Sequence, residues 1–188
     1  MPTIRLATPK DGQAVAEIYA HWVSQTTYSY EYEPPTPAEM RKRIKNISKK
    51  HAFLICEERG EIIGYAYNSD PFERKAFSWC AEISVYLKSG YEGTGLGRQL
   101  VCACEKLLRR QGFLKIYSLI SSENRSSLRF HEKLGYRYLA EFQNAGFKHG
   151  RWVNLFWYEK DLDSFQENPS EPLSIHDLPH EVIMEILR

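Results

Sequence analysis

Three alternate glycines and one carboxylate have types and spacing that fit a chemical role. Gly93, Gly95 and Gly97 lie between a segment of β-branched and aromatic residues, Glu82 to Leu87, and an apolar pattern with helical spacing. Glycine lets a backbone approach a ligand closely, and the first N–H groups of a helix are unpaired. A strand, a glycine turn and a helix in this order favour the binding of a phosphate or pyrophosphate at the start of the helix. For the glycines alone, a simple turn between strand and helix is the alternative.

Two widespread phosphate motifs do not fit this turn. A P-loop ends in Gly-Lys-Ser/Thr, whereas Gly97 is followed by Arg98 and Gln99. A dinucleotide-binding turn has the spacing GxGxxG, whereas the spacing here is GxGxG. The sequence therefore indicates a phosphate site of another kind.

Residues 92–97, EGTGLG, resemble the acetyl-CoA pyrophosphate loop of the GNAT acetyltransferases, whose pattern is Arg/Gln-x-x-Gly-x-Gly/Ala. Glu92 departs from the usual Arg or Gln, and an acid beside a pyrophosphate is expected to weaken affinity. Three further stretches resemble one branch of that family, the phosphinothricin and amino-acid-analogue N-acetyltransferases. They are WCAEISVYL (79–87), RFHEKLGY (129–136) and AGFKHGRW (145–152), of which the last is the longest unusual match.

The resemblance covers roughly residues 3–160 and implies an α/β (α+β) GNAT fold. Such a fold has a mixed, mostly antiparallel central sheet flanked by helices, with a splayed central strand pair that holds acetyl-CoA. The implied enzyme is an acyltransferase that moves acetyl from acetyl-CoA to the α-amino group of a small amino-acid-like substrate. Phosphinothricin, methionine sulfone and methionine sulfoximine are substrates of that type. No metal is implied.

Two side chains are implied to act in catalysis. An amine attacks a thioester only as the free base, and Glu82 lies at the family's general-base position. A strand glutamate paired with an arginine is the alternative. His131 falls where many relatives carry a tyrosine near the leaving sulfur, so it either protonates the thiolate or shapes the pocket.

The resemblance also implies which residues hold acetyl-CoA. Backbone groups along the strand would bond to the pantetheine arm, and an amide there could polarise the thioester oxygen. The glycine turn would hold the pyrophosphate, and an asparagine would contact the cofactor or simply cap a helix. These residues are Val85, Tyr86, Leu87, Gly93, Thr94, Gly95, Leu96, Gly97, Arg98 and Asn124.

Substrate selection is expected to need a cation and a polar wall. Arg74 matches a family arginine before the central strand, and its planar fork suits a carboxylate or phosphinate, although a surface role is the alternative. Residues 25–32, QTTYSYEY, supply Thr27 and Tyr30 either to a pocket wall or to an edge strand or packed loop. Lys148 lies in the AGFKHGRW hairpin. Because relatives are homodimers, we expect that hairpin near a pocket close to a dimer interface.

Composition narrows the class of protein. The chain has 188 residues, 43% hydrophobic and 26% charged, with a net charge of +1, so bulk charge predicts neither nucleic-acid nor membrane binding. No apolar run approaches a membrane span, and the start of the sequence lacks a signal-peptide core. Reduced thiols and a cytoplasmic location are expected, because no CxxC pair occurs among the cysteines at positions 56, 80, 102 and 104.

Periodicity and turn residues predict the elements that would position these groups. Thr36 and Glu39 form a capping box, Asn124 can cap a helix, and Gly112 and Gly135 can end helices. The predicted strands are 3–7, 52–57, 61–68, 82–87, 113–120, 136–142 and 152–158, and helices are predicted at 15–22, after Thr36, at 96–111 and at 124–134.

Residues 1–162 are expected to form the N-acetyltransferase domain and 163–188 a linker with a short helical tail. The stretch LPHEVIMEIL resembles the opening of an F-box, a motif that binds ubiquitin-ligase adaptors. A docked or frayed terminal helix is the alternative. Two other functions remain open: acetylation of another amine, such as a protein N-terminus or polyamine, and a non-catalytic acyl-CoA-binding or adaptor protein.

Overall fold

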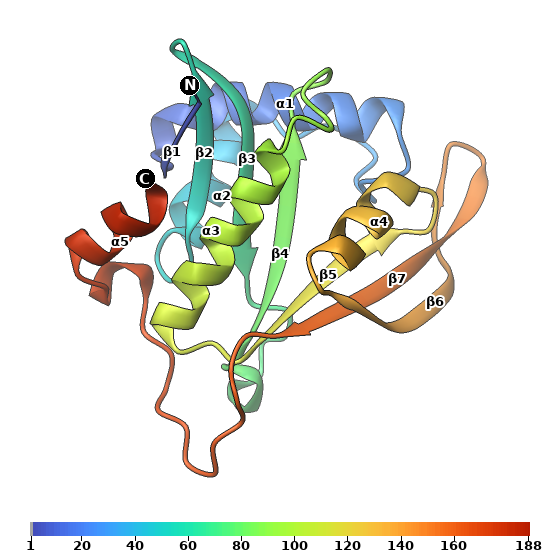
Figure 1. Cartoon of the computed structure of the whole chain (residues 1–188). Helices are drawn as coiled ribbons and strands as arrows, with labels where there is room; N and C mark the ends of the chain where they lie inside the picture. The colour runs from blue at the N-terminus through green and yellow to red at the C-terminus, as the bar shows by residue number, and fades with distance from the viewer. Residues whose placement is uncertain (1) are drawn as a thin grey trace.

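A seven-stranded sheet in the order β1-β2-β3-β4-β5-β7-β6 forms the centre of the protein, in a computed structural model that describes residues 2–188 (Figure 1). The strands are β1 (Thr3–Leu6), β2 (Phe53–Glu58), β3 (Glu61–Ser69), β4 (Cys80–Leu87), β5 (Lys115–Ser121), β6 (Arg137–Lys148) and β7 (Arg151–Asp161). The helices are α1 (Gly12–Gln25), α2 (Pro37–Ile47), α3 (Leu96–Gln111), α4 (Arg125–Lys133) and α5 (His180–Leu187). None of these helices is long and apolar enough to cross a membrane.

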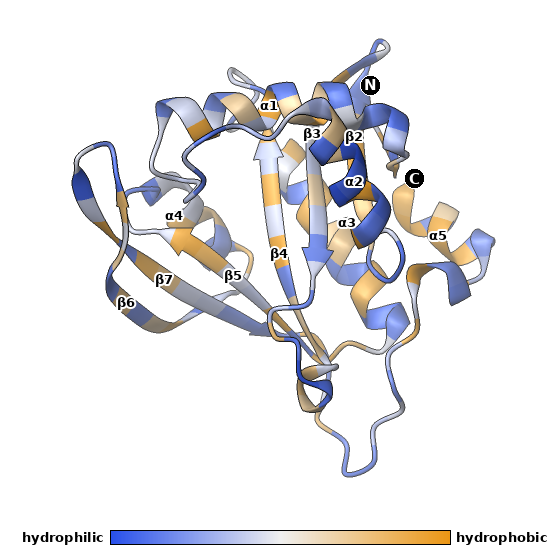
Figure 2. Cartoon of the chain, turned by 180° about the vertical axis from the view of Figure 1, so that it is seen from behind, coloured by the Kyte–Doolittle hydropathy of each residue, from blue (hydrophilic) through white to orange (hydrophobic). Residues whose placement is uncertain are grey.

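Neighbouring strands are antiparallel except at the centre, where β4 and β5 run parallel. These two strands pair at three positions, from Cys80 opposite Lys115 to Glu82 opposite Tyr117. Beyond that point β4 continues to Leu87 and β5 to Ser121, and the strands diverge in both views (Figures 1 and 2). The expected mixed, mostly antiparallel GNAT-type sheet is confirmed, with its central pair splayed.

Each face of the sheet carries its own core because successive side chains of a strand point to opposite faces. On one face, Tyr65 packs with α1 and α2 through Val15 and Ile44. On the other face, Ile83 packs with α3 through Leu100. Alternation along β4 therefore assigns Glu82 to the α1–α2 face and its neighbour Ile83 to the α3 face.

The helix boundaries follow local capping signals in the sequence. The Thr36 hydroxyl accepts the Glu39 N–H, and the Glu39 carboxylate accepts the Thr36 N–H, so the predicted capping box forms. The Asn124 side chain accepts the Ser127 N–H at 3.1 Å and starts α4. Gly112 ends α3 in the left-handed conformation that glycine tolerates, at φ 92°.

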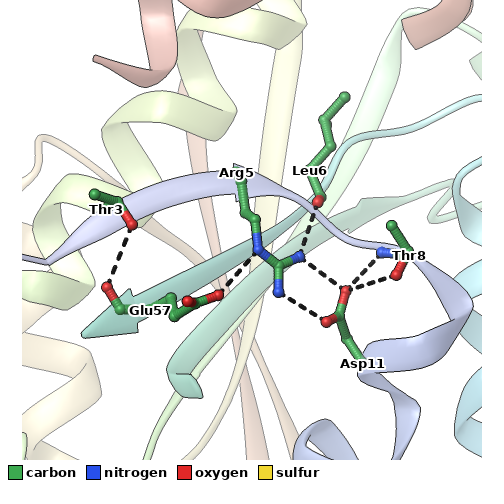
Figure 3. A network of polar contacts seen from close by, with 6 residues as sticks. All are labelled: Thr3, Arg5, Leu6, Thr8, Asp11 and Glu57. Atoms are coloured by element: carbon green, nitrogen blue, oxygen red, sulfur yellow. Dashed lines mark hydrogen bonds and ion pairs between the residues drawn. The ribbon is translucent and has the colours of Figure 1, made fainter. Parts of the chain in front are cut away.

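A polar network joins the first strand to the first helical turn (Figure 3). The Arg5 guanidinium donates to both oxygens of Asp11, at 2.8 and 2.9 Å, and to Glu57 on β2 at 3.2 Å. Asp11 also accepts the Thr8 N–H at 2.7 Å. Because Asp11 is the residue before α1, this network fixes the end of β1 and the start of α1 relative to β2.

The C-terminal tail packs back onto the α3 face of the sheet. Ile175, Leu178 and Ile183 are buried in the same core as α3, and Figure 2 shows hydrophobic residues along α5. The side chain of Gln111, at the end of α3, donates to the Leu173 and Lys50 carbonyls at 2.9 Å each. The apolar side of the F-box-like stretch therefore has its partner within this chain, as expected of a docked helix.

The last hairpin is longer than the sequence predicts. We expected strands at 136–142 and 152–158, whereas β6 and β7 continue to a turn at 149–150. β6 passes Asn144 with a left-handed φ of 50° and a register shift between Phe142 and Gly146. This bulge interrupts the alternating pattern on which the prediction depended. Residues 26–36 contain no regular strand or helix, so the QTTYSYEY stretch is a packed loop.

Candidate functional site

An outer cavity of about 510 Å³ opens beside the start of α3. Its walls come from the second half of β4, the glycine turn, α4 and the loop after α1. The lining residues are Trp22, Tyr28, Val85, Tyr86, Leu87, Glu92, Gly93, Gly95, Gly97, Arg98, Asn124, Ser126, Ser127, Arg129, Phe130 and Lys133. The structure thus brings together eight of the ten residues that the sequence assigned to one ligand.

An inner cavity of about 50 Å³ lies in the gap between β4 and β5. Segments 83–86 of β4 and 118–121 of β5 form its walls, and His131 of α4 closes it. Five residues line both cavities: Tyr28, Val85, Tyr86, Asn124 and Ser127. The two hollows are therefore adjacent, and a long ligand can reach from the glycine turn to the space between the strands.

The glycine turn has the geometry of an anion site. Gly93 and Gly95 have φ values of 77° and 91°, and a Cβ at either position would meet nothing within 4 Å. The first N–H groups of α3 follow directly and lack helical partners. Thr94 and Leu96 do not line the cavity: the Thr94 hydroxyl donates to Tyr91, and the Leu96 side chain enters the core.

Three cations line the outer cavity, namely Arg98, Arg129 and Lys133. Within residues 2–188 none of them forms an ion pair with a carboxylate. The carboxylate of Glu92, the residue that departs from the family pattern, accepts the Gly90 N–H at 2.8 Å. The cavity thus offers bare amides and free positive charge to an anionic ligand.

The open edge of β4 supplies backbone groups to the site. Beyond Glu82, no strand among residues 2–188 pairs with the side of β4 that faces β5. The peptide groups from Ile83 onward that point to this side can therefore bond to an extended ligand. One of these peptide groups already has a partner within the protein: the Leu87 carbonyl accepts the Trp22 indole N–H at 2.8 Å. At the other wall, the Asn124 carboxamide oxygen caps α4 while the side chain lines both cavities.

Glu82 lies at the last pairing position before β4 and β5 separate. Burial raises the pKa of its carboxyl above the usual range. Within residues 2–188 this carboxylate forms no ion pair, so the alternative of a strand glutamate paired with an arginine is not what the structure has. Glu82 lines neither cavity. It faces the α1–α2 side of the sheet next to Tyr67, the same face as Ser84 and Tyr86, which do line the inner cavity.

His131 lies on the opposite side of the strand gap and is 2% exposed. Its Nδ1 lies 2.9 Å from the Ser127 carbonyl oxygen and its Nε2 lies 3.0 Å from the Ser118 hydroxyl. Burial lowers the pKa of this imidazole to about 4. At neutral pH the ring is uncharged, and both nitrogens are already engaged.

The residues predicted to contact a small substrate do not gather at the cavities. The Thr27 hydroxyl donates to Glu123 at 2.5 Å, and the Tyr30 ring packs on Gly146. The buried Lys148 ammonium donates to the Val23 and Ser29 carbonyls at 2.7 Å each. Arg74 is exposed in the loop before β4. Their assignment to substrate binding therefore stays a prediction.

Several side chains that line the cavities carry no signal in the sequence. Tyr28 stacks on Trp22 with ring centroids 6.0 Å apart, yet the hydroxyl pattern of its loop pointed to Thr27 and Tyr30. Ser118 and Ser127 carried no motif, since serine is common in strands and helix starts. Only the packing of the loop and of α4 brings these residues to one place. Among residues 2–188, no cluster of three His, Cys, Asp or Glu side chains could hold a metal ion.

The family model that matches this chain is that of an acetyltransferase domain, and two similar relatives are acetyltransferases. Residues 4–157 match the model of the Acetyltransferase (GNAT) domain. A phosphinothricin N-acetyltransferase of Streptomyces viridochromogenes is 32% identical over 85% of this chain and 87% of its own length. An L-methionine sulfoximine/L-methionine sulfone acetyltransferase of Salmonella typhimurium is 32% identical over 86% of this chain and 95% of its own.

A solved structure is similar over almost the whole chain. It is a GNAT superfamily phosphinothricin acetyltransferase from Sinorhizobium meliloti in complex with AcCoA, with a TM-score of 0.86 and 31% identity. The match covers 92% of this chain and 95% of that one.

The environment of His131 predicts a pH-dependent stability. A folded pKa of about 4, below the usual 6.5, means that the unfolded chain binds the proton more readily between these values. The free energy of unfolding is therefore unaffected by the titration of His131 above pH about 6.5 and decreases as pH falls from there toward 4. We expect His131→Phe to abolish about 2 kcal/mol of the stability difference between pH 7 and pH 5.

Urea unfolding of both proteins at the two pH values measures this difference. His180→Gln, at an exposed histidine of α5, is the matched control and should keep the wild-type dependence. Equal pH dependence in wild type and His131→Phe would show that the His131 ring is not held neutral by burial.

Proposed function

Because this chain belongs to the GNAT acetyltransferases, we propose that it acetylates the α-amino group of a small amino-acid-like substrate, using acetyl-CoA and Glu82 as general base. It is an N-acetyltransferase of the phosphinothricin and methionine sulfoximine type. The observation that carries the proposal is the pair of adjacent cavities that lead from the glycine turn into the gap between β4 and β5.

The outer cavity fits acetyl-CoA by its donors and charges. The amides after Gly93 and Gly95, together with Arg98, would hold the pyrophosphate. Arg129 and Lys133 place further positive charge at the same cavity, suited to the remaining phosphate of CoA. The free edge of β4 would bond to the pantetheine arm, as an added strand does. The acetyl end then lies in the inner cavity, between the strands.

Glu82 would act from the other face of the sheet. The strands separate immediately after the Glu82–Tyr117 pair, so an amine that approaches from the α1–α2 side meets the carboxylate before it reaches the gap. A carboxyl with a raised pKa is a stronger base than an ordinary glutamate and can take the ammonium proton directly or through one water. The neutral amine then attacks the thioester carbon.

Two observations support the proposed acceptor: the compounds on which the similar proteins act, according to their names, and the position of one cation. Phosphinothricin, methionine sulfone and methionine sulfoximine carry an α-amino acid and a tetrahedral polar group. Arg74 lies in the loop between β3 and β4, forms no ion pair within residues 2–188, and has a guanidinium suited to such anions. We propose that Arg74 binds one anionic group of the acceptor, with Thr27, Tyr30 and Lys148 fixing the surrounding walls.

Assembly and location also belong to the proposal. Phe147 and Trp152 lie at the end of the β6–β7 hairpin, 46% and 62% exposed, with their rings in edge contact. Exposed aromatic pairs favour protein interfaces, so we propose that this hairpin contributes to a homodimer. Four free cysteines agree with the cytoplasmic location proposed from the sequence.

Substitution of Gly95 tests the cofactor site. A side chain at φ 91° is strained by about 1 kcal/mol, and it would stand in the open space from which a pyrophosphate is proposed to approach the amides. We expect Gly95→Ala to lower acetyl-CoA affinity at least about tenfold in calorimetry. Gly60→Ala, at φ 81° in the β2–β3 turn and equally free of neighbours, is the control for strain alone. Equal affinities in the two variants would remove the glycine turn from the site.

Substitution of Glu82 tests the base. Glu82→Gln keeps the shape but removes the basic oxygen, so kcat should fall roughly 10²- to 10⁴-fold while acetyl-CoA affinity is unchanged. In the wild type, kcat/KM should decline as pH falls through the raised pKa of Glu82. Glu185→Gln, on the exposed side of α5, is the control. Wild-type kcat in Glu82→Gln, under conditions where chemistry limits the rate, would end this assignment.

A panel of amines, with free-thiol release as the readout, tests the acceptor. We expect acetylation of phosphinothricin, methionine sulfone or methionine sulfoximine. Arg74→Ala should raise KM for these acceptors more than it changes acetyl-CoA affinity. Lys75→Ala, at the neighbouring exposed cation, should leave KM unchanged. If a peptide or polyamine is acetylated and none of the three compounds is, the acceptor proposal is wrong.

A further inference from the structure

A buried polar chain closes the inner cavity on its α4 side. Ser118 of β5 is 3% exposed and His131 of α4 is 2% exposed, and both line the cavity. The Ser118 hydroxyl lies 3.0 Å from Nε2 of His131, whose Nδ1 lies 2.9 Å from the Ser127 carbonyl oxygen. Ser118 and His131 are thus two buried, hydrogen-bonded polar side chains at the wall of the inner cavity, where a bound ligand can contact them.

The geometry decides where the protons lie. A backbone carbonyl can only accept, so the short contact to Ser127 places the ring proton on Nδ1. Nε2 then carries a lone pair and accepts the Ser118 hydroxyl proton. His131 has no proton to give to a ligand in the cavity, because its one N–H is bound to the protein. Two hydroxyls at this wall carry a movable proton, those of Ser118 and Ser127. Ser127 Oγ lies 3.3 Å from Nδ1, on the other side of the ring, and only the Ser118 hydroxyl lies against Nε2.

Other serines near the cavity are placed differently. Ser84 alternates with Ile83, so it shares the face of Glu82 and Tyr67. Ser121 is offset from Ser118 by three residues along β5 and so points to the opposite face. Ser118 is thus the strand hydroxyl on the α4 side, across the gap from the base. In an acyl transfer the attacking amine and the departing sulfur are separate substituents of one carbon, and these two faces can serve them separately.

We propose that Ser118 donates a hydrogen bond to the sulfur of the departing CoA thiolate, and that His131 is the positioning residue that holds Ser118 for this contact. The inference rests on the acetyl-CoA-dependent function proposed above. It revises the sequence-derived alternatives for His131, because the ring serves another side chain instead of acting as the acid.

The step balances without a proton transfer from Ser118. The amine, neutral after losing one proton to Glu82, bonds through nitrogen to the acetyl carbon. The C–S bond then breaks, its electron pair stays on sulfur, and the nitrogen loses a second proton to solvent as the amide forms. The Ser118 O–H turns from neutral Nε2 to the anionic sulfur and keeps its proton. Hydrogen bonds to charged acceptors are stronger than those to neutral ones, so the exchange is favourable only once the thiolate has formed. Solvent later protonates the thiolate.

Binding of CoA tests this contact apart from catalysis. Calorimetry compares CoA with desulfo-CoA, which lacks the sulfur, between about pH 7 and about pH 9, the range in which a thiol ionises. For the wild type we expect the preference for CoA to grow with pH. Ser118→Ala should reduce the CoA affinity at the upper pH roughly tenfold and leave desulfo-CoA unchanged.

Kinetics test the division of roles. Ser118→Ala and His131→Phe should each lower kcat roughly tenfold with little change in KM for acetyl-CoA, and the double variant should lose no more than either one. Ser118→Thr, which keeps the hydroxyl, and His131→Asn, which keeps an acceptor, should recover part of the rate. Circular dichroism and desulfo-CoA binding establish that each variant is folded.

Three results would overturn the inference. The first is an unchanged preference for CoA over desulfo-CoA in folded Ser118→Ala. The second is a full loss of rate in His131→Asn while Ser118→Ala retains wild-type kcat, which would make the imidazole the acid. The third is failure of the wild type to bind either CoA or desulfo-CoA, which would contradict the proposed function itself and this inference with it.

Discussion

The short parallel ladder between β4 and β5 is the constraint on which the site depends. Three pairs, ending at Glu82 and Tyr117, hold the two halves of the sheet together, and the strands then part. A sheet edge inside a protein leaves peptide groups without partners, which is unfavourable unless something occupies them. Here the unpaired edge of β4 faces the adjoining cavities, so the backbone groups that the fold leaves free are those that a ligand can use.

Because the gap is open, its walls must be held by contacts from distant parts of the chain. The Trp22 indole reaches from α1 to the Leu87 carbonyl. Glu123, two residues after β5, accepts from Arg151 of β7 and from Thr27, and these hydrogen bonds lower the pKa of its carboxyl to about 2. The Lys148 ammonium joins the β6–β7 hairpin to the carbonyls that follow α1. These bonds fix the loop that contributes Tyr28 to both cavities.

Burial separates the electrostatic roles of the two faces. On the α1–α2 face, the loss of solvent disfavours the charged carboxylate and raises the pKa of Glu82. On the α4 face, the same loss of solvent lowers the pKa of His131 and leaves a neutral ring between two hydrogen bonds. One physical cause therefore raises the pKa of a carboxyl on one side of the gap and leaves an uncharged hydrogen-bonded pair on the other.

The sequence by itself determined most of the elements and the glycine turn before α3, because these depend on local chemistry. Capping residues such as Thr36 and Asn124, and the glycines around Gly95, act within a few residues of where they stand, and the structure places them as predicted. Only the tertiary structure decided which side chains meet. Glu82 and His131 lie on opposite faces, Lys148 is held by carbonyls far away in the sequence, and Ser118 reaches His131 through the packing of α4 on β5. Strand alternation predicts the face of the sheet on which a side chain lies, but not which side chain it meets across the gap between β4 and β5. That meeting depends on the residue at which the two strands stop pairing, and no local sequence pattern encodes this residue.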